Sequence, residues 1–180
     1  MGYMNNMVKS FMDMGANTIS VNLVNMPARQ ASVDQMYDFF NEHRDIFSEM
    51  TPQVSVSGTI KVGSEKTTTT TVSGVSEYYG KLKNYKLEKG RFLSYADMVS
   101  RQKVVVIGYY VASKLFGSPK AAIGETIKIN GSAFTVVGVV QRQDKTQLSA
   151  RGSDDFAFMP YSTAGQLNGT SVPDYYIFAT

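Results

Sequence analysis

The residues that could do chemistry include VVVIGYYVASKLFG (104–117), where a β-branched run is followed by a glycine and a helical segment. Many nucleotide-binding domains begin in this order, and several glycines in register let their backbone approach a phosphate. Here Gly108 stands alone, and Tyr109 and Tyr110 occupy the next two positions, where their bulk would block a phosphate. The segment therefore predicts a structural turn at Gly108 and a helix that ends at Gly117, without a phosphate site.

Other catalytic or metal-binding patterns are weak. His43 is the single histidine and the 180-residue chain has no cysteine, so a metal site with paired imidazoles and thiolate chemistry are both excluded. The nucleophile elbow GxSxG is absent, and neither the pair Asp154 and Asp155 nor the acidic set Glu42, Asp45 and Glu49 has the spacing of a calcium loop. We expect no catalytic residue, cofactor or metal, and interpret His43 as a packed or surface residue. A serine hydrolase that uses His43 is retained as an alternative to be tested.

A basic and aromatic segment is the strongest candidate for binding. Its predicted contact residues are Tyr78, Tyr79, Lys81, Lys83, Tyr85, Lys86, Lys89 and Arg91. Such a patch could bind nucleic acid, anionic lipid or an acidic protein, and tyrosine offers apolar area with a polar tip. The alternative is a solvated face of a small subdomain. The net charge of +3 is too small to indicate a nucleic-acid partner, and none is expected.

The first half of the chain reads as a strand, a helix and a hairpin. Residues 1–14 have the spacing of an amphipathic helix, and TISVNLV (18–24) alternates like a half-buried strand. Ser32 and Gln35 form a capping box for a helix whose apolar face runs to Phe47.

Pro52 is expected to close that helical segment before the strand VSVSGTIKV (54–62). Strand, helix and strand predict a βαβ unit with parallel strands and a right-handed crossover. KTTTTTV (66–72) is expected to complete an antiparallel hairpin with a solvated threonine face, which makes the sheet mixed.

The second half contains shorter elements. SYADM (94–98) predicts a capped turn of helix, and IGETIKINGSAFTVVGVV (123–140) predicts a hairpin with Asn130 and Gly131 in a type I′ turn and a bulge at Gly138. Residues 141–155 are expected to form a mobile loop. A strand (156–160), a short helix (162–169) and a final strand (175–180) follow. An apolar strand at the chain end would be an exposed edge, so we expect the natural protein to continue.

Several segments together resemble a known family. GVSEYYGKLKNYKLEKGRFLSYAD (74–97), VVVIGYYVASKLFG (104–117), IGETIKINGSAFTVVGVV (123–140) and FMPYSTAGQLNG (158–169) occur in the order seen in MacB-like permeases of ABC transporters, part of the FtsX-like permease group. GANTISV (15–21) is similar to the stretch just after the first transmembrane helix of that family.

The resemblance implies an α+β fold, in which a mixed sheet carries a βαβ porter-like subdomain and a smaller mixed α/β subdomain. The expected division is a helix continuing from a transmembrane stalk (1–14), the porter-like βαβ and hairpin (15–75), the smaller subdomain (76–155) and a return to the porter-like subdomain (156–180). The second porter-like repeat would then be incomplete at Thr180, and the threonine-rich hairpin matches no signature of the family.

The resemblance also implies a function. The chain would be a non-catalytic extracytoplasmic domain of an ABC transporter permease, anchored by transmembrane helices outside this sequence. It would transmit ATP-driven motion from a cytoplasmic ABC ATPase, work in a permease dimer, and dock a membrane-fusion or adaptor protein or an exported substrate. The alternative is a soluble module that binds a glycan or an anion through its tyrosine pairs and basic patch.

Overall fold

A computed structural model describes residues 17–22 and 31–180, so the helix expected at 1–14 lies outside the described residues. The strands are β1 (Thr18–Val21), β2 (Glu49–Val56), β3 (Ile60–Val62), β4 (Glu65–Thr67), β5 (Thr71–Val75), β6 (Leu87–Gly90), β7 (Val104–Ile107), β8 (Thr126–Ile129), β9 (Ser132–Val140), β10 (Phe156–Pro160) and β11 (Tyr175–Ala179). The helices are α2 (Val33–Glu42), α3 (Tyr79–Leu82), α4 (Tyr95–Val99), α5 (Tyr109–Phe116), α6 (Pro119–Ala122) and α7 (Tyr161–Asn168).

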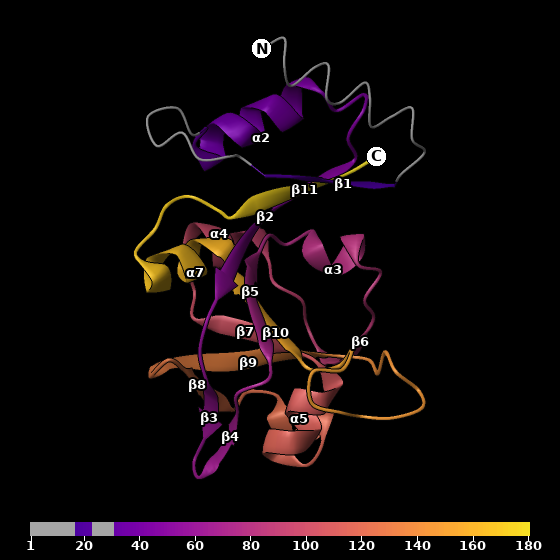
Figure 1. The fold of residues 1–180 in the computed structure, drawn as a ribbon, viewed down its shortest axis with the longest axis vertical. Helices are drawn as coiled ribbons and strands as arrows, with labels where there is room; N and C mark the ends of the chain where they lie inside the picture. Colours follow the sequence, from indigo (N-terminus) through magenta and orange to yellow (C-terminus); the bar gives the residue numbers. More distant parts are fainter. Residues whose placement is uncertain (1–16, 23–30) are drawn as a thin grey trace.

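The strands of the described chain form one mixed sheet, which confirms the predicted α+β class. Its order is β1-β11-β2-β5-β10-β7-β9-β8-β3-β4, and β6 pairs with β9. The β5–β10 and β7–β9 pairs are parallel, and the other pairs are antiparallel. The sheet extends along the long axis of the molecule, with α2, β1 and β11 at one end and α5, β3 and β4 at the other (Figure 1).

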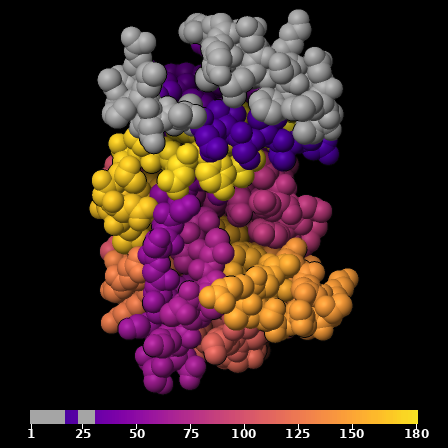
Figure 2. Space-filling model, viewed as in Figure 1, coloured from indigo at the N-terminus to yellow at the C-terminus, as the bar shows by residue number. Residues whose placement is uncertain are grey.

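The first and last strands of the described chain meet at one end of this sheet. β11 pairs antiparallel with β1 on one side (Thr18 opposite Ala179) and with β2 on the other (Met50 opposite Phe178). β1 and β2 therefore run parallel, as predicted, but β11 separates them. The expectation that the last strand is an exposed edge is wrong, because β11 is internal and Phe178 is buried. In the space-filling view, indigo atoms of the N-terminal part contact yellow atoms of the C-terminal part (Figure 2).

Helix α2 begins as predicted and ends earlier. Ser32 accepts a hydrogen bond from the Gln35 N–H, and the Gln35 side chain accepts one from the Ser32 N–H, so the capping box is confirmed. The helix ends at Glu42 instead of Phe47. Phe47 is nevertheless buried, because a turn after the helix directs it into the core, with its N–H donating to the His43 carbonyl.

Strand β2 contains Pro52, which was expected to end the helical segment before it. β2 pairs with β5 only from Val54 onward, so Pro52 has β11 as its single sheet neighbour. A proline lacks the N–H donor of a sheet ladder and is tolerated where a second neighbour does not require it.

The threonine run forms a two-part hairpin whose face is only partly solvated. β3 pairs with β4 at the tip, and β2 pairs with β5 nearer the centre of the sheet. Thr67 and Thr70 are buried, and Thr70 Oγ1 donates to Asp155 Oδ1 at 2.6 Å. The prediction of a solvated threonine face is wrong for these two residues, because the 141–155 loop supplies a buried carboxylate on that side.

The turns around β7 and β8 explain the glycines there. Gly108 caps α5 in an extended conformation, and a Cβ atom at Gly108 would lie 2.2 Å from the Asp154 carbonyl oxygen, so only glycine fits. Gly117 ends α5 with φ of 82°, and Asn130 (φ 51°) and Gly131 (φ 80°) have the two positive φ angles of a type I′ turn.

The predicted bulge in β9 is confirmed. The β7–β9 register shifts between the pair Val105–Val136 and the pair Val106–Gly138.

Three hydrophobic clusters fill the described fold. One packs α5, α6 and α7 against β2, β5 and β7–β10, a second lies between α2 and the β1–β11–β2 strands, and a third lies beneath α3 and α4. The second and third clusters are separate, and the surface between them carries the candidate site.

Candidate functional site

The aromatic part of the predicted basic patch belongs to the core. The Tyr79 ring centroid lies 5.3 Å from that of Phe158 in an edge-on contact. The Tyr85 ring stacks on Phe156 at 5.1 Å. Both tyrosines are half-buried and pack on the third cluster, so much of each ring is engaged in positioning α3 and β6.

Two of the basic residues in the patch are bound within the fold. Lys81 Nζ lies 2.6 Å from Glu49 Oε1, and this hydrogen bond raises the pKa of Lys81. Arg91 Nη1 lies 2.8 Å from Asp97 Oδ2, in the capping box of α4. These two pairs tie the patch to β2 and α4.

The remaining lysines are the part of the patch that stays accessible. Lys83 lies with its ammonium 5.9 Å from the Tyr79 ring centroid, and Lys86 and Lys89 are exposed with no ion pair among the described residues. A hollow of about 380 Å³ beside them is lined by Glu77, Lys81, Asn84, Tyr85, Lys86, Leu87 and Phe92. Tyr78 is oriented differently and lines a second, larger groove.

That groove lies between α2 on one side and α4 with the start of α7 on the other. We call it the α2–α4 groove; it measures about 700 Å³ and is lined by Asp34, Tyr37, Asp38, Phe40, Asn41, Arg44, Glu77, Tyr78, Tyr95, Met98 and Tyr161. Sequence reasoning missed it, although Asp34, Tyr37, Asp38 and Asn41 have the spacing of a single helix face. That helix face can be recognised as one wall of a groove only when it is known that α4 and the start of α7 lie opposite it.

The groove combines carboxylates with aromatic rings. Asp34 and Asp38 are exposed on α2, whereas Glu77 is half-buried. Burial raises the pKa of Glu77, and the nearby charge of Glu49 raises it further. Arg44 is the one cation among the described residues that line the groove, and its guanidinium carbon lies 4.7 Å above the Phe40 ring centroid.

Tyr37 and Tyr161 both line the groove, with ring centroids 6.5 Å apart. Burial raises the pKa of Tyr37, and Tyr161 and Glu77 add to the shift. Tyr176 lies close by: it is fully buried, and its hydroxyl has no hydrogen-bond partner among the described residues. Burial raises its pKa as well, with contributions from Tyr161 and Asp34.

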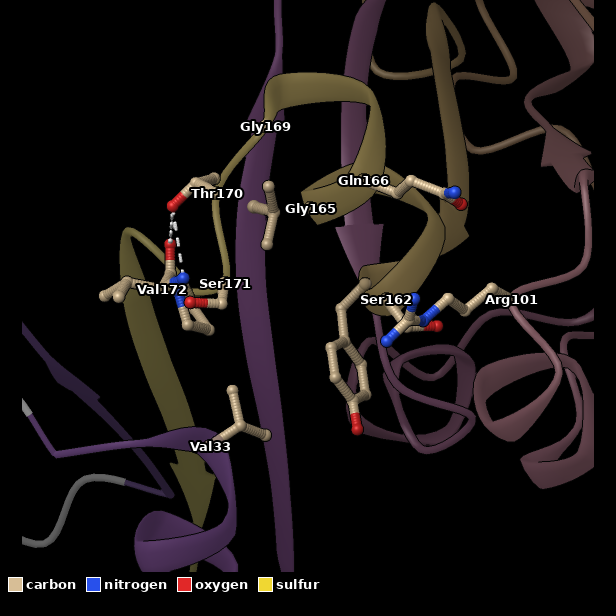
Figure 3. A pocket seen from close by; sticks show the side chains of 12 residues that line it. Val33, Arg101, Ser162, Gly165, Gln166, Gly169, Thr170, Ser171 and Val172 are labelled. Carbon is tan, nitrogen blue, oxygen red and sulfur yellow. Dashed lines mark hydrogen bonds between the residues drawn. The ribbon is translucent and has the colours of Figure 1, made fainter.

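A third hollow of about 440 Å³ lies beside α7, and Tyr161 lines it as well as the α2–α4 groove. Figure 3 shows Arg101, Ser162 and Gln166 along one wall and the turn Thr170–Val172 along the other. Thr170 Oγ1 accepts from the Val172 N–H at 3.1 Å, and Ser162 donates to the Met98 carbonyl at 2.6 Å. Ser162 and the Thr170 hydroxyl are therefore engaged within the fold.

The sequence candidates for chemistry, His43, Gly108 and Asp154, line none of these three hollows. His43 Nδ1 is 2.8 Å from the Phe39 carbonyl oxygen, and its ring packs on Phe39. The Asp154 carbonyl accepts from the Tyr110 N–H at the start of α5, next to Gly108. Within residues 17–22 and 31–180, no group of three or more histidine, aspartate or glutamate residues is arranged to hold a metal ion.

In residues 17–22 and 31–180, each helix is too short or too polar to cross a membrane.

Comparison with known proteins identifies the family. The profile of the MacB-like periplasmic core domain matches residues 1–180. The chain belongs to this family. The resemblance drawn from the sequence motifs is therefore confirmed. The family comprises periplasmic domains of transporter permeases, which are generally non-catalytic.

Relatives of known name are ABC-type export proteins. The pyoverdine export ATP-binding/permease protein PvdT of Pseudomonas syringae pv. syringae is 36% identical over 110 residues, which cover 61% of this chain and 17% of that protein. The macrolide export ATP-binding/permease protein MacB of Chlorobium luteolum is 35% identical over 111 residues, or 62% of this chain and 16% of that protein. The matched part of the chain thus spans about a sixth of the length of these relatives.

Solved structures show the same fold. The periplasmic region of MacB from Actinobacillus actinomycetemcomitans has a TM-score of 0.73 at 23% identity, covering 92% of this chain and 75% of that one. The extracellular domain of the ABC-type transporter YknZ from Gram-positive bacteria has a TM-score of 0.71 at 20% identity, covering 91% of this chain and 83% of that one.

Proposed function

We propose that this chain is the extracytoplasmic module of an ABC-type export permease, which transmits ATP-driven conformational change to a docked adaptor or exported substrate and performs no chemistry itself. It would act in a permease dimer, coupled through membrane helices to a cytoplasmic ABC ATPase. The family match over residues 1–180 and the export proteins among the relatives support this assignment.

The observation that carries the mechanical part is the meeting of the two ends of the described chain. β1 pairs with β11 along four residue pairs, and the Thr180 N–H donates to the Asn17 carbonyl at 3.2 Å. Force applied at either end would enter the sheet at the same place. From there, hydrogen bonds through β11, β2 and β5 would carry it toward β3, β4 and α5 at the far end (Figure 1).

The transmission of motion can be tested in the full-length transporter that contains this chain, reconstituted in lipid with its ATPase. The chain has no cysteine, so Lys120→Cys, on the exposed face of α6 at the far end, gives a single spin-labelling site within it. We expect the distance between the two labels of the dimer to change between the nucleotide-free and ATP-bound states. A variant that binds ATP without hydrolysing it should keep the two labels at the distance of the ATP-bound state. Unchanged distances during active ATP hydrolysis would contradict transmission through this module.

We further propose that the accessible lysines Lys83, Lys86 and Lys89 contact a partner, replacing the larger patch expected from sequence. Lys81 is left out because its replacement by Glu would place a second carboxylate beside Glu49, whose side chain is only 10% exposed. The triple variant Lys83→Glu/Lys86→Glu/Lys89→Glu should fold normally and reduce export in cells. The matched control is Lys61→Glu/Lys66→Glu at the β3–β4 tip, where both lysines are also exposed. Equal export by both variants would show that the three lysines are merely solvated.

A further inference from the structure

We propose that the α2–α4 groove is a docking site for a basic segment of a protein partner, which inserts an arginine or lysine side chain between α2 and Glu77. This inference rests on the proposed docking function and adds a location and a chemistry to it. Three properties of the groove carry it: its charge, its aromatic lining and the apolar surface beside it.

The charge of the groove is opposite to that of the chain. The chain has a net charge of +3, yet the described residues that line the groove supply three carboxylates, from Asp34, Asp38 and Glu77, and one cation, Arg44. Glu77 forms no ion pair among the described residues, and burial raises its pKa. A half-buried carboxylate without a cation is stabilised when a partner supplies one.

The aromatic lining suits the same kind of side chain. Arg44 already lies on the Phe40 ring, so the groove accommodates a guanidinium group over an aromatic face. Tyr78 and Tyr95 line the groove as well, and tyrosine rings attract lysine and arginine in the same way. The groove can therefore contact both the charged head and the apolar stem of an incoming basic side chain.

The surface beside the groove favours a protein segment over a free cation. Tyr95 is 69% exposed and Val99 is 65% exposed, and they are the large hydrophobic side chains that stand out as exposed in the described chain. They lie one turn apart on α4, and Tyr95 lines the groove. A small cation would leave this apolar area in water, whereas a segment with apolar residues next to its basic ones would cover it.

The test is a binding measurement on the 180-residue chain with a fluorescein-labelled peptide that alternates arginine and leucine. Two further probes are the same peptide with glutamate in place of arginine, and arginine amide as a competitor. The groove variant is Asp38→Asn/Glu77→Gln; Asp34 is kept because a carboxylate in the first turn stabilises α2. The control variant is Glu42→Gln/Asp45→Asn, which removes two exposed carboxylates from the same region outside the groove.

We expect saturable binding of the arginine peptide, weakened about tenfold or more in the groove variant because a charge-assisted contact is lost. The control variant should bind like the unmodified chain, and Tyr95→Ala should bind more weakly than Tyr95→Phe. Tighter binding of the glutamate peptide, or equal binding by the groove and control variants, would overturn the proposal. If arginine amide displaced the peptide at the concentrations at which the peptide itself binds, a single small cation would suffice. That result would overturn the proposal that a protein segment is required.

The two proposals fail separately. The peptide measurement involves no membrane, ATP or export, so a negative result removes the groove and leaves the transmission of motion untouched. Unchanged spin-label distances would remove transmission and leave the peptide result valid.

Discussion

At the scale of single residues, Asp155 connects the threonine run to the 141–155 loop. Its buried carboxylate accepts hydrogen bonds from Thr69 Oγ1 at 2.5 Å, from Thr70 Oγ1 at 2.6 Å and from the Arg151 N–H at 2.8 Å. Because three donors converge on one carboxylate, this loop is held against β4 and β5 although it contains no regular element.

Asp155→Asn should therefore destabilise the chain. The amide has a single acceptor oxygen and places an NH2 group where the second carboxylate oxygen accepted, so the three hydrogen bonds cannot all be kept, which costs about 1–3 kcal/mol. Urea unfolding followed by circular dichroism measures this difference. Asp45→Asn, which removes an exposed carboxylate, should unfold at nearly the same urea concentration as the unmodified chain. Equal stability of both variants would mean that Asp155 does not hold the loop.

Glu77 provides a prediction of pH dependence. Its pKa in the folded chain is raised above the ordinary 4.5 by burial, so the protonated form is favoured by folding. That contribution is fully present below pH 4.5 and is lost as the pH rises through the folded pKa. Glu77→Gln should thus stabilise the chain at pH 7, by less than about 1 kcal/mol, and make no difference at pH 4. Thermal unfolding at both pH values tests this; a variant less stable at pH 7 would contradict it.

At the scale of elements, the β8–β9 hairpin depends on its turn. Asn130 and Gly131 both have positive φ, a region that β-branched residues resist. Gly131→Val should destabilise the chain by about 1 kcal/mol or more. Gly131→Asn is the matched control, because asparagine tolerates positive φ and should cost less. Thermal unfolding that is the same for Val and Asn would show that the turn is not under this constraint.

Helix α4 depends on Asp97, which caps the helix and pairs with Arg91. Burial acts to raise the pKa of Asp97, but the hydrogen bonds from Arg91 and Ser94 outweigh it and leave the pKa lowered. This stability is present above the ordinary pKa of 3.8 and is lost as the pH falls through the folded pKa.

Asp97→Asn should therefore cost about 1 kcal/mol at pH 7, since Arg91 is half exposed and its charge is screened. The difference should shrink below pH 3.8, which urea unfolding at several pH values can follow. A pH-independent difference would indicate that packing of the side chain, and not its charge, holds α4.

At the scale of the whole molecule, the strand–glycine–helix segment is closed to phosphate. The Asp154 carbonyl lies over Gly108 and accepts from the Tyr110 N–H at 3.2 Å, and the Gly108 N–H donates to the Phe156 carbonyl at 2.8 Å. Two of the N–H groups at this helix start, those of Gly108 and Tyr110, are thus engaged by the return strand β10 and the loop before it and are not free for a phosphate.

The isolated chain should accordingly neither bind nor hydrolyse ATP. Isothermal titration with ATP and magnesium should show no saturable heat, and phosphate release should equal that of buffer. Saturable binding of ATP would contradict the proposed role as a module moved by an ATPase elsewhere in the transporter.

Local chemistry accounts for the parts of the fold that the sequence predicted well. The Ser32 capping box, the Asn130–Gly131 turn and the bulge near Gly138 depend on a few neighbouring residues, so they can be recognised without knowledge of distant partners. The ordered motifs from residue 74 onward also identified the family. The end of α2, the strand character around Pro52 and the burial of Thr70 could not be predicted, because β11 and Asp155 come from more than eighty residues away.

The sequence by itself determined where α2 and α4 begin, which family the chain belongs to and which turns need glycine, because these depend on side chains close together along the chain. Only the tertiary structure decided which of those side chains remain free. In the folded chain, Tyr79 and Tyr85 pack against the core, and Lys81 and Arg91 pair with carboxylates. An acidic groove lies between α2 and α4. These outcomes depend on pairing between strands that are far apart in the sequence, such as the pairing of β11 with both β1 and β2. The local spacing of residues does not predict that strand order.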